Sequence, residues 1–337
     1  MPGETSERTG IGDDIRERTV AVGDVDLHLL EAGDDGPLVV LAHGFPELGW
    51  SWRHQLPALA EAGYRVIAPD QRGYGRSSRP EALADYDIFH LTGDLVGLLD
   101  HLDEEQATFA GHDWGSMVVW NLALLHPERV RGVCGMSVPF PPRPPMPPVQ
   151  LMRAAFADSF FYIVYFQEPG VADAELGADP RRTMYRMLCG LASPDELTAE
   201  DATAFAADDD RGFVDRIPTP DGLPDWLTQA ELDHYVAEFE RTGFTGGINW
   251  YRNLDRNWEL TEHLDGAHVK VPSLFIGGAD DPVLAMTPPE IQDPFLDDHR
   301  GSVVIDGAGH WVQQEAPEPV NAALLGFLDE LHEGNQR

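Results

Sequence analysis

Basic residues are scarce in this sequence, and lysine is nearly absent. The 337 residues include 58 Asp and Glu but only 23 Lys and Arg, which leaves a formal net charge of −35 at pH 7. Lys270 is the only lysine. So acidic a surface repels DNA, RNA and anionic membranes, and we expect none of them as a partner. The composition is instead typical of a salty cell interior or of a high-GC genome.

Cysteine and long apolar runs are also scarce. Only Cys134 and Cys189 are present, so we expect a reduced cytoplasmic protein, with one cysteine in its core and one in a lid. No run reaches the length that crosses a bilayer. Residues 1–16 are charged and lack the apolar stretch of a signal peptide, so they are predicted to be a loose tail. The P-loop, G-x-G-x-x-G and H-E-x-x-H motifs are missing, so no metal or organic cofactor is predicted.

Strand-like and helical segments alternate along the chain, which predicts an α/β fold with a mostly parallel sheet. Leucines between residues 91 and 102, and apolar residues between 320 and 331, recur at helical spacing and predict two helices that pack on this sheet. The predicted strands are Thr19–Val22, Asp26–Glu31, Leu38–Ala42, Arg65–Pro69, Ala107–Gly111, Gly132–Ser137, Ser273–Gly277 and Ser302–Asp306.

The segment Gly111-His112-Asp113-Trp114-Gly115 joins a strand-like run to a helical run. It matches the nucleophile elbow G-x-S-x-G, with Asp113 in place of the serine. A carboxylate that attacks a saturated carbon leaves an ester that water can cleave, whereas a hydroxyl would leave an inert ether. Asp113 is therefore the predicted nucleophile, and the predicted electrophile is an epoxide or an alkyl halide. The alternative is an aspartate in an exposed turn.

Two further candidates follow in the order that this elbow requires, an acid and then a histidine. His310 lies in a glycine-rich loop after a strand-like run, where open α/β sheets place their chemistry, and is the predicted general base. Asp281 follows the apolar residues 274–276 and would orient His310. Asp280 remains an alternative to Asp281. The segment after the strand that precedes the lid, residues 136–139, contains no carboxylate.

An oxyanion hole is expected from the loop after an earlier strand. Residues 38–42 are apolar throughout, as expected for a parallel strand covered on both faces, and lead into His43-Gly44-Phe45-Pro46-Glu47. The backbone N–H groups of Phe45 and Trp114 are predicted to converge on one oxygen and to stabilise its charge. A plain Gly- and Pro-rich turn is the alternative.

Taken together, these motifs resemble those of the α/β-hydrolase epoxide hydrolases of the soluble type. The resemblance extends from about Val20 to Leu331 and includes the motif Asp70-Gln71-Arg72-Gly73-Tyr74-Gly75. It implies an α/β-hydrolase core at residues 17–138 and 259–335, with a helical lid at 139–258. It also implies conversion of an epoxide to a vicinal diol through a hydroxyalkyl ester of Asp113.

The resemblance further implies that two lid tyrosines activate the epoxide oxygen. The segments at residues 162–170 and 249–253 look like lid segments of that family, in which one tyrosine from each points at the nucleophile. The matching residues are Tyr162 and Tyr251. Phenols suit this role because they stay protonated at neutral pH. Tyr165 would share a helix face with Tyr162, and the sequence pattern alone does not separate the two.

The lid is expected to begin with the proline-rich residues 139–148, which serve as a stiff connector. Its aromatic residues either line an apolar substrate pocket or form the lid's own core. We expect a small apolar epoxide and water as partners, and a monomer or a homodimer. The predicted pocket residues are Phe45, Trp114, Phe166 and Trp250.

Three other functions compete with this one. Haloalkane and haloacid dehalogenases share the aspartate and the histidine, and Trp114 would suit halide binding, but they have no use for two phenols. An esterase is disfavoured because Asp113 occupies the serine position. A ligand receptor that has lost turnover has no need for a complete set of groups that activate water.

Overall fold

Eight strands form one sheet in the computed structural model, which describes residues 15–190, 205–207 and 209–334. The sheet order is β1-β2-β4-β3-β5-β6-β7-β8. β1 and β2 pair antiparallel, β2 also pairs antiparallel with β4, and every other pair is parallel. The strands are β1 (Arg16–Val22), β2 (Val25–Ala32), β3 (Leu38–Ala42), β4 (Arg65–Pro69), β5 (Ala107–His112), β6 (Val130–Met136), β7 (Ser273–Gly278) and β8 (His299–Ile305).

The predicted α/β fold is confirmed, and each predicted strand overlaps an observed one. β1 is longer than predicted, because it begins at Arg16, inside the range expected to be a tail. Ile15 is buried and Arg16 pairs with Glu31 of β2, so apolar burial and a ladder of hydrogen bonds order these residues. The rest of the predicted tail, residues 1–14, lies outside the described residues.

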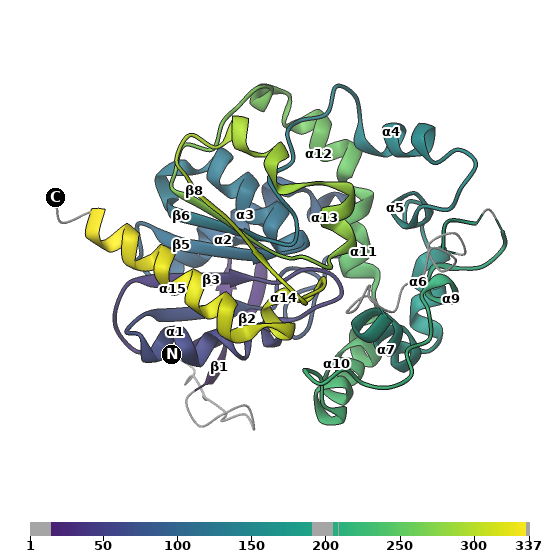
Figure 1. The fold of residues 1–337 in the computed structure, drawn as a ribbon, viewed down its shortest axis with the longest axis horizontal. Helices are drawn as coiled ribbons and strands as arrows, with labels where there is room; N and C mark the ends of the chain where they lie inside the picture. Colours follow the sequence, from purple (N-terminus) through teal and green to yellow (C-terminus); the bar gives the residue numbers. More distant parts are fainter. Residues whose placement is uncertain (1–14, 191–204, 208, 335–337) are drawn as a thin grey trace.

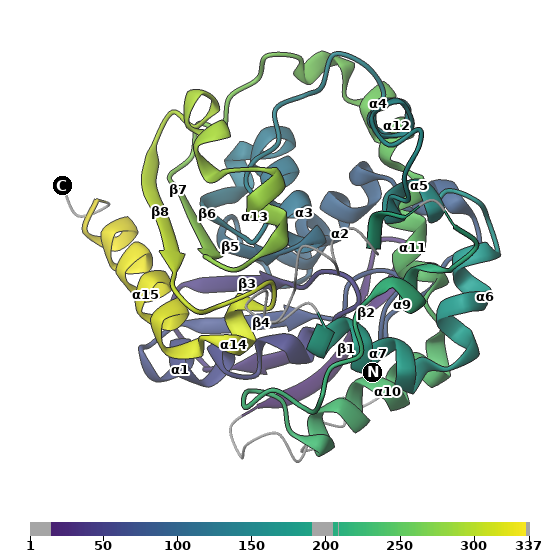
Figure 2. The same ribbon diagram turned by 45° about the vertical axis from the view of Figure 1, so that its right-hand side comes forward.

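Helices cover both faces of the sheet (Figure 2). Helices α1 (Gln55–Glu61) and α15 (Pro317–Gly334) contact each other on one face, and α2 (Ile88–His101) and α3 (Trp114–Leu125) do so on the other. The leucine stripe predicted from spacing is the buried side of α2. Two short helices at the edge of the site are α13 (Pro282–Met286) and α14 (Val312–Glu315). The 3-10 turns are Gly49–Trp52, Leu83–Tyr86, Pro127–Arg129, Glu262–Leu264, Pro289–Ile291 and Asp293–Phe295.

The connection between β6 and β7 is a long insertion whose described residues form helices and loops (Figure 1). Residues 139–147 are not helical, in agreement with the predicted connector, and the first helix begins with a proline at a position where proline is tolerated. The predicted lid boundary at residue 258 falls inside the last helix. The helices are α4 (Pro148–Ala155), α5 (Tyr162–Tyr165), α6 (Val171–Ala178), α7 (Pro180–Gly190), α9 (Phe213–Arg216), α10 (Gln229–Thr242), α11 (Thr245–Arg252) and α12 (Leu254–Leu260).

Helix α11 lies directly against the core, and two glycines make this approach possible. A Cβ on Gly246 would lie 2.1 Å from the Gly73 carbonyl oxygen, and a Cβ on Gly247 would lie 2.6 Å from the Phe45 ring. Because no side chain separates α11 from these loops, the helix places Tyr251 beside Phe45, with ring centroids 5.5 Å apart. The insertion is thereby held over the loops that follow β3 and β4.

Candidate active site

Asp113 sits in a sharp turn between β5 and α3. Its backbone has φ 51° and ψ −117°, a conformation that non-glycine residues rarely adopt and that is typical of a nucleophile elbow. A Cβ on Gly111 would lie 2.2 Å from the Gly115 carbonyl oxygen, and a Cβ on Gly115 would lie 2.0 Å from that of Ala42. Glycine is therefore required at both flanking positions, as the predicted motif demands.

The Asp113 carboxylate lies beside backbone N–H groups. The Phe45 N–H donates to Asp113 Oδ1 at 2.8 Å, and the Trp114 N–H is close enough to lower the pKa of the carboxyl. Burial raises the pKa of Asp113, while the charge of His310 and these N–H groups oppose the shift. The two donors predicted to form an oxyanion hole thus meet at one carboxylate.

His310 lies between Asp113 and Asp281. Its Nε2 is 3.7 Å from Asp113 Oδ2, and its Nδ1 is 3.1 Å from both oxygens of Asp281. Asp281 is 2% exposed and also accepts the Val283 N–H at 2.8 Å. The backbone N–H of Asp280 donates to the Ala308 carbonyl instead. Of the two candidate acids, Asp281 is therefore the one whose carboxylate contacts the imidazole.

These carboxylates control the charge of His310. Burial by itself lowers the pKa of His310, but Asp281 and Asp113 outweigh burial and raise the pKa to about 9. The pairing with His310 also lowers the pKa of Asp281, although burial opposes that change. The two carboxylates therefore favour the protonated form of the imidazole.

Replacement of Asp281 tests this electrostatic coupling. In Asp281→Asn the imidazole loses its main opposite charge, so we expect the pKa of His310 to fall from about 9 toward the 6.5 of an unperturbed histidine. An NMR titration of the His310 ring measures the value directly. The matched Asp280→Asn variant should leave it unchanged. A His310 pKa that stays near 9 in Asp281→Asn would contradict the coupling.

Tyr162 and Tyr251 approach Asp113 from the insertion. Their ring centroids are 5.9 Å apart. The Tyr251 ring also packs against the Trp114 indole, with centroids 5.1 Å apart. Burial raises the pKa of both phenols, and the Asp113 carboxylate raises each of them further. Both hydroxyls therefore remain protonated at neutral pH within the field of Asp113.

Tyr165, the open alternative to Tyr162, is engaged elsewhere, because its hydroxyl donates to Glu175 Oε2 at 2.8 Å.

The predicted pocket residues differ in what they contact. Phe45 and Phe166 both contact the Tyr251 ring, with centroids 5.5 and 5.2 Å away. Trp250 packs on Trp114, and its indole N–H donates to the Arg72 carbonyl. These contacts of Trp250 favour packing between insertion and core, and its place in the pocket stays a prediction.

A buried ion pair behind the site was not predicted. The Glu47 side chain is fully buried and accepts hydrogen bonds from His112 Nδ1 at 2.6 Å, the Gly44 N–H at 2.9 Å and Gln313 Nε2 at 2.8 Å. Burial would raise the pKa of Glu47, but His112 and these donors lower it to about 2. His112 Nε2 donates to the His310 carbonyl at 2.7 Å. Glu47 and His112 both lie in recognised motifs, but their pairing is visible only in three dimensions.

Ser137 was not predicted to belong to the site. It lies in the segment 136–139, which contains no carboxylate. Its backbone has φ 61°, at the end of β6, and its hydroxyl lies within reach of both the His310 carbonyl, at 2.8 Å, and the Asp281 carboxylate. A hydroxyl has one proton and donates to one of these groups at a time. Ser137 thus supports the histidine and its acid from the neighbouring strand.

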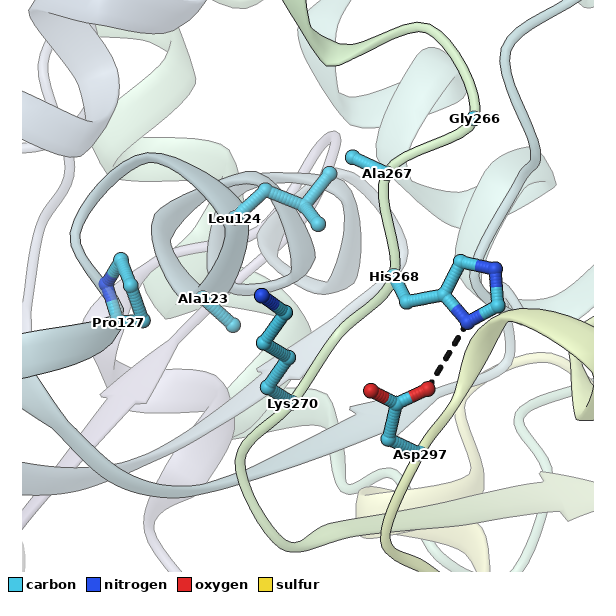
Figure 3. A pocket seen from close by; sticks show the side chains of 8 residues that line it. All are labelled: Ala123, Leu124, Pro127, Gly266, Ala267, His268, Lys270 and Asp297. Atoms are coloured by element: carbon cyan, nitrogen blue, oxygen red, sulfur yellow. Dashed lines mark hydrogen bonds and ion pairs between the residues drawn. The ribbon is translucent and has the colours of Figure 1, made fainter.

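A surface cleft of about 420 Å³ lies apart from these groups (Figure 3). His268 Nδ1 and Asp297 Oδ1 pair across it at 2.8 Å, and Lys270 stands on the same segment as His268. None of the predicted catalytic residues lines this cleft. Within the described ranges, no three His, Cys, Asp or Glu side chains gather as metal ligands, and no helix is long and apolar enough to span a membrane.

Known proteins are similar to this chain in sequence and in structure over most of its length. A family model for the alpha/beta hydrolase fold matches residues 37–317. Epoxide hydrolase A of Mycobacterium tuberculosis is 58% identical over 316 residues, which cover 94% of this chain and 98% of that protein. The crystal structure of Epoxide Hydrolase A from Mycobacterium thermoresistibile is 59% identical, with a TM-score of 0.90 over 94% of this chain and 98% of that one.

An epoxide hydrolase structure from an endophytic Streptomyces is 43% identical, with a TM-score of 0.91 over 96% of this chain and 97% of that one. These matches span the core and the insertion alike. The chain therefore belongs to the α/β-hydrolase fold family and, within it, to the epoxide hydrolases.

Proposed function

We propose that this enzyme converts a small apolar epoxide to a vicinal diol through a covalent hydroxyalkyl ester of Asp113. The observation that carries the proposal is the position of the Asp113 carboxylate, 3.7 Å from His310 Nε2 and bonded to the Phe45 N–H. A carboxylate in this position can attack a carbon, and the imidazole beside it can activate water against the resulting ester.

In the first half-reaction, Asp113 attacks one ring carbon. A bond forms between a carboxylate oxygen and that carbon, the carbon's bond to the ring oxygen breaks, and the ring oxygen becomes an alkoxide. Tyr162 and Tyr251 donate hydrogen bonds to this oxygen, and one of them gives it a proton and becomes a phenolate. The proposal is supported by the protonated state of both phenols, which burial and the Asp113 charge maintain.

In the second half-reaction, His310 removes a proton from water, and the resulting hydroxide adds to the ester carbonyl carbon. The bond from that carbon to the diol oxygen then breaks, and the diol leaves with the proton of the added hydroxyl, so that Asp113 is again a carboxylate. The proton on His310 returns to the phenolate that the first half-reaction left. Esterification removes the charge of Asp113, one of the two neighbouring carboxylates that raise the pKa of His310. The pKa of His310 therefore falls when the ester forms, and a larger fraction of the imidazole is free to accept a proton. The N–H groups of Phe45 and Trp114 would stabilise the oxyanion that forms as water adds.

Removal of both phenols tests the proposed role of the tyrosines. In the double variant Tyr162→Phe and Tyr251→Phe, the alkoxide has no proton donor, so we expect ester formation to slow by about 10²- to 10⁴-fold. Rapid quenching followed by intact-mass measurement gives this rate. Tyr165→Phe is the matched control and should retain the rate of the unmodified enzyme. Ester formation at the unmodified rate in the double variant would remove the tyrosines from the mechanism.

A dehalogenase with the same nucleophile is the second candidate, and the two phenols beside Asp113 argue against it. A leaving halide needs N–H donors rather than the protonated hydroxyls of Tyr162 and Tyr251. The experiment compares diol formation from an aryl epoxide with halide release from a bromoalkane. We expect diol and no halide. Halide release without diol would reverse the assignment.

We also propose that residues 139–258 act as a lid that covers the reacting groups and supplies the two phenols. Contacts between α10 and the core support this role. Arg53 pairs with Glu231 at 2.8 Å, and the Tyr235 hydroxyl lies 2.6 Å from Ser51 Oγ. A cytoplasmic location and a monomeric or homodimeric state remain predictions from the sequence.

A further inference from the structure

The loop that carries His310 is held by a single carboxylate on both sides of the histidine. Glu315 is the last residue of α14. Its Oε2 accepts a hydrogen bond from the Gly309 N–H at 2.8 Å, and its Oε1 accepts one from the Trp311 N–H at 2.7 Å. The N–H groups of the residues before and after His310 are thus bound to one carboxylate. A carboxylate can accept both bonds at once because each of its oxygens is an acceptor.

The His310 carbonyl, which shares a peptide group with the Trp311 N–H, is also bound. The His310 carbonyl accepts from His112 Nε2 at 2.7 Å and from Ser137 Oγ at 2.8 Å. Glu315 therefore completes a set of bonds that leaves the backbone around His310 little freedom to rotate. Because the imidazole is attached to this backbone, each of these bonds helps to fix the direction in which the ring points.

The location of Glu315 is costly for a charged group. Burial raises the pKa of Glu315 to about 7, the Asp281 carboxylate raises it further, and the two N–H bonds and His310 oppose the rise. An ionised side chain at such a site needs a compensating interaction, and among the described residues the Glu315 side chain accepts hydrogen bonds only from the two N–H groups of the His310 loop. At pH 8.5 the carboxylate is ionised and both bonds are available.

We propose that Glu315 is a positioning residue for hydrolysis of the ester, because it aims the His310 imidazole at the attacking water. Glu315 acts through the loop and touches neither the epoxide nor the ester. This inference rests on the proposed function, since it assumes that an ester of Asp113 is hydrolysed with the help of His310.

The proposal predicts an effect on one half-reaction only. Attack on the ring depends on Asp113 and the phenols, none of which Glu315 contacts. Hydrolysis depends on the imidazole, whose Nε2 must remain beside the ester carbonyl. A misplacement of a catalytic group by about 1 Å is enough to cost on the order of 10²-fold in rate.

The test is a single-turnover experiment at pH 8.5 with an aryl epoxide, rapid quenching and intact-mass measurement. Glu315→Gln keeps the shape of the side chain but offers an NH₂ group to one of the two N–H donors. We expect its ester hydrolysis to slow roughly 10- to 100-fold, while ester formation stays within about twofold of the unmodified rate. Glu318→Gln, at an exposed position in the first turn of α15, is the matched control and should behave like the unmodified enzyme.

Glu315→Asp keeps the charge on a side chain that is one methylene shorter. The shorter carboxylate can bind one of the two N–H groups but does not reach both at once. We expect its hydrolysis rate to lie between those of Glu315→Gln and the unmodified enzyme. This variant alone decides the question if Glu315→Gln does not fold: slower hydrolysis with normal ester formation supports the proposal, and an unmodified hydrolysis rate overturns it.

Two other results would overturn the positioning role. One is an unmodified hydrolysis rate in Glu315→Gln, and the other is an equal slowing of both half-reactions, which a purely structural role would cause. Failure of the proposed function would look different, because no protein-bound ester would then form in the unmodified enzyme or in any variant.

Discussion

Asp113→Ala is expected to abolish diol formation, with a loss of at least about 10⁴-fold in turnover. The substitution removes the only carboxylate that lies at the elbow, where the Phe45 and Trp114 N–H groups meet. Water is a much weaker nucleophile toward a ring carbon, and no other side chain occupies its place. The measurement is the rate of diol formation from an aryl epoxide, followed by chromatography.

The control for Asp113→Ala is Asp280→Asn. This variant also removes one carboxylate near the site, but Asp280 binds the Ala308 carbonyl through its backbone N–H, which the substitution leaves in place. We expect it to retain most of the activity. Thermal unfolding of Asp113→Ala should be cooperative, which separates a lost nucleophile from a lost fold. Diol formation by a folded Asp113→Ala protein at more than about one per cent of the normal rate would contradict the role of Asp113.

His310→Gln is expected to form the ester and to retain it. Asp113 still attacks the ring, because the nucleophile and both phenols are unchanged, but no imidazole removes a proton from water. Steady-state turnover should fall by about 10³-fold or more. Intact-mass measurement should show an added mass equal to that of one epoxide per chain, and this adduct should be missing when Asp113→Ala is combined with His310→Gln.

A His310→Gln enzyme that is inactive but carries no adduct would contradict the proposed order of steps. The adduct must also be located. Fragmentation of the trapped protein should place the added mass on the peptide that contains Asp113. An adduct on any other carboxylate, such as Asp281, would show that Asp113 is not the nucleophile.

Most of the fold was predictable because its signals are local. Each buried parallel strand is a short apolar run, and β3 and β4 have the predicted bounds. The strand at the edge was less well predicted, since β1 is partly exposed and its first residues have no apolar run. Its start depends on pairing with β2, which is a tertiary interaction.

The candidate site also contains residues that could be predicted from their neighbours in sequence and residues that could not. Asp113 and His310 follow strands in recognisable turns, so their positions could be predicted from neighbouring residues. The choice of Asp281 over Asp280 depends on which carboxylate the turn after β7 directs at His310, and only coordinates give that direction. Tyr162 and Tyr251 came from resemblance, because a tyrosine that packs and a tyrosine that donates a proton look alike in sequence.

The supporting groups were not predicted, because their partners are distant in the chain. Glu47 and His112 are 65 residues apart, and Ser137 and His310 are 173 residues apart. No periodicity connects such residues. Glu315 is only four to six residues from the groups that it binds, but a single acidic residue after a histidine is too common a pattern to predict a role.

The central claim is that an oxygen of Asp113 enters the product, and a single turnover in water enriched with ¹⁸O tests it most directly. With enzyme in excess over epoxide, the first diol should be unlabelled, and one ¹⁸O should appear in the peptide that contains Asp113. If the label instead appears in the first diol and the peptide stays unlabelled, water attacks the ring directly and the covalent mechanism is wrong.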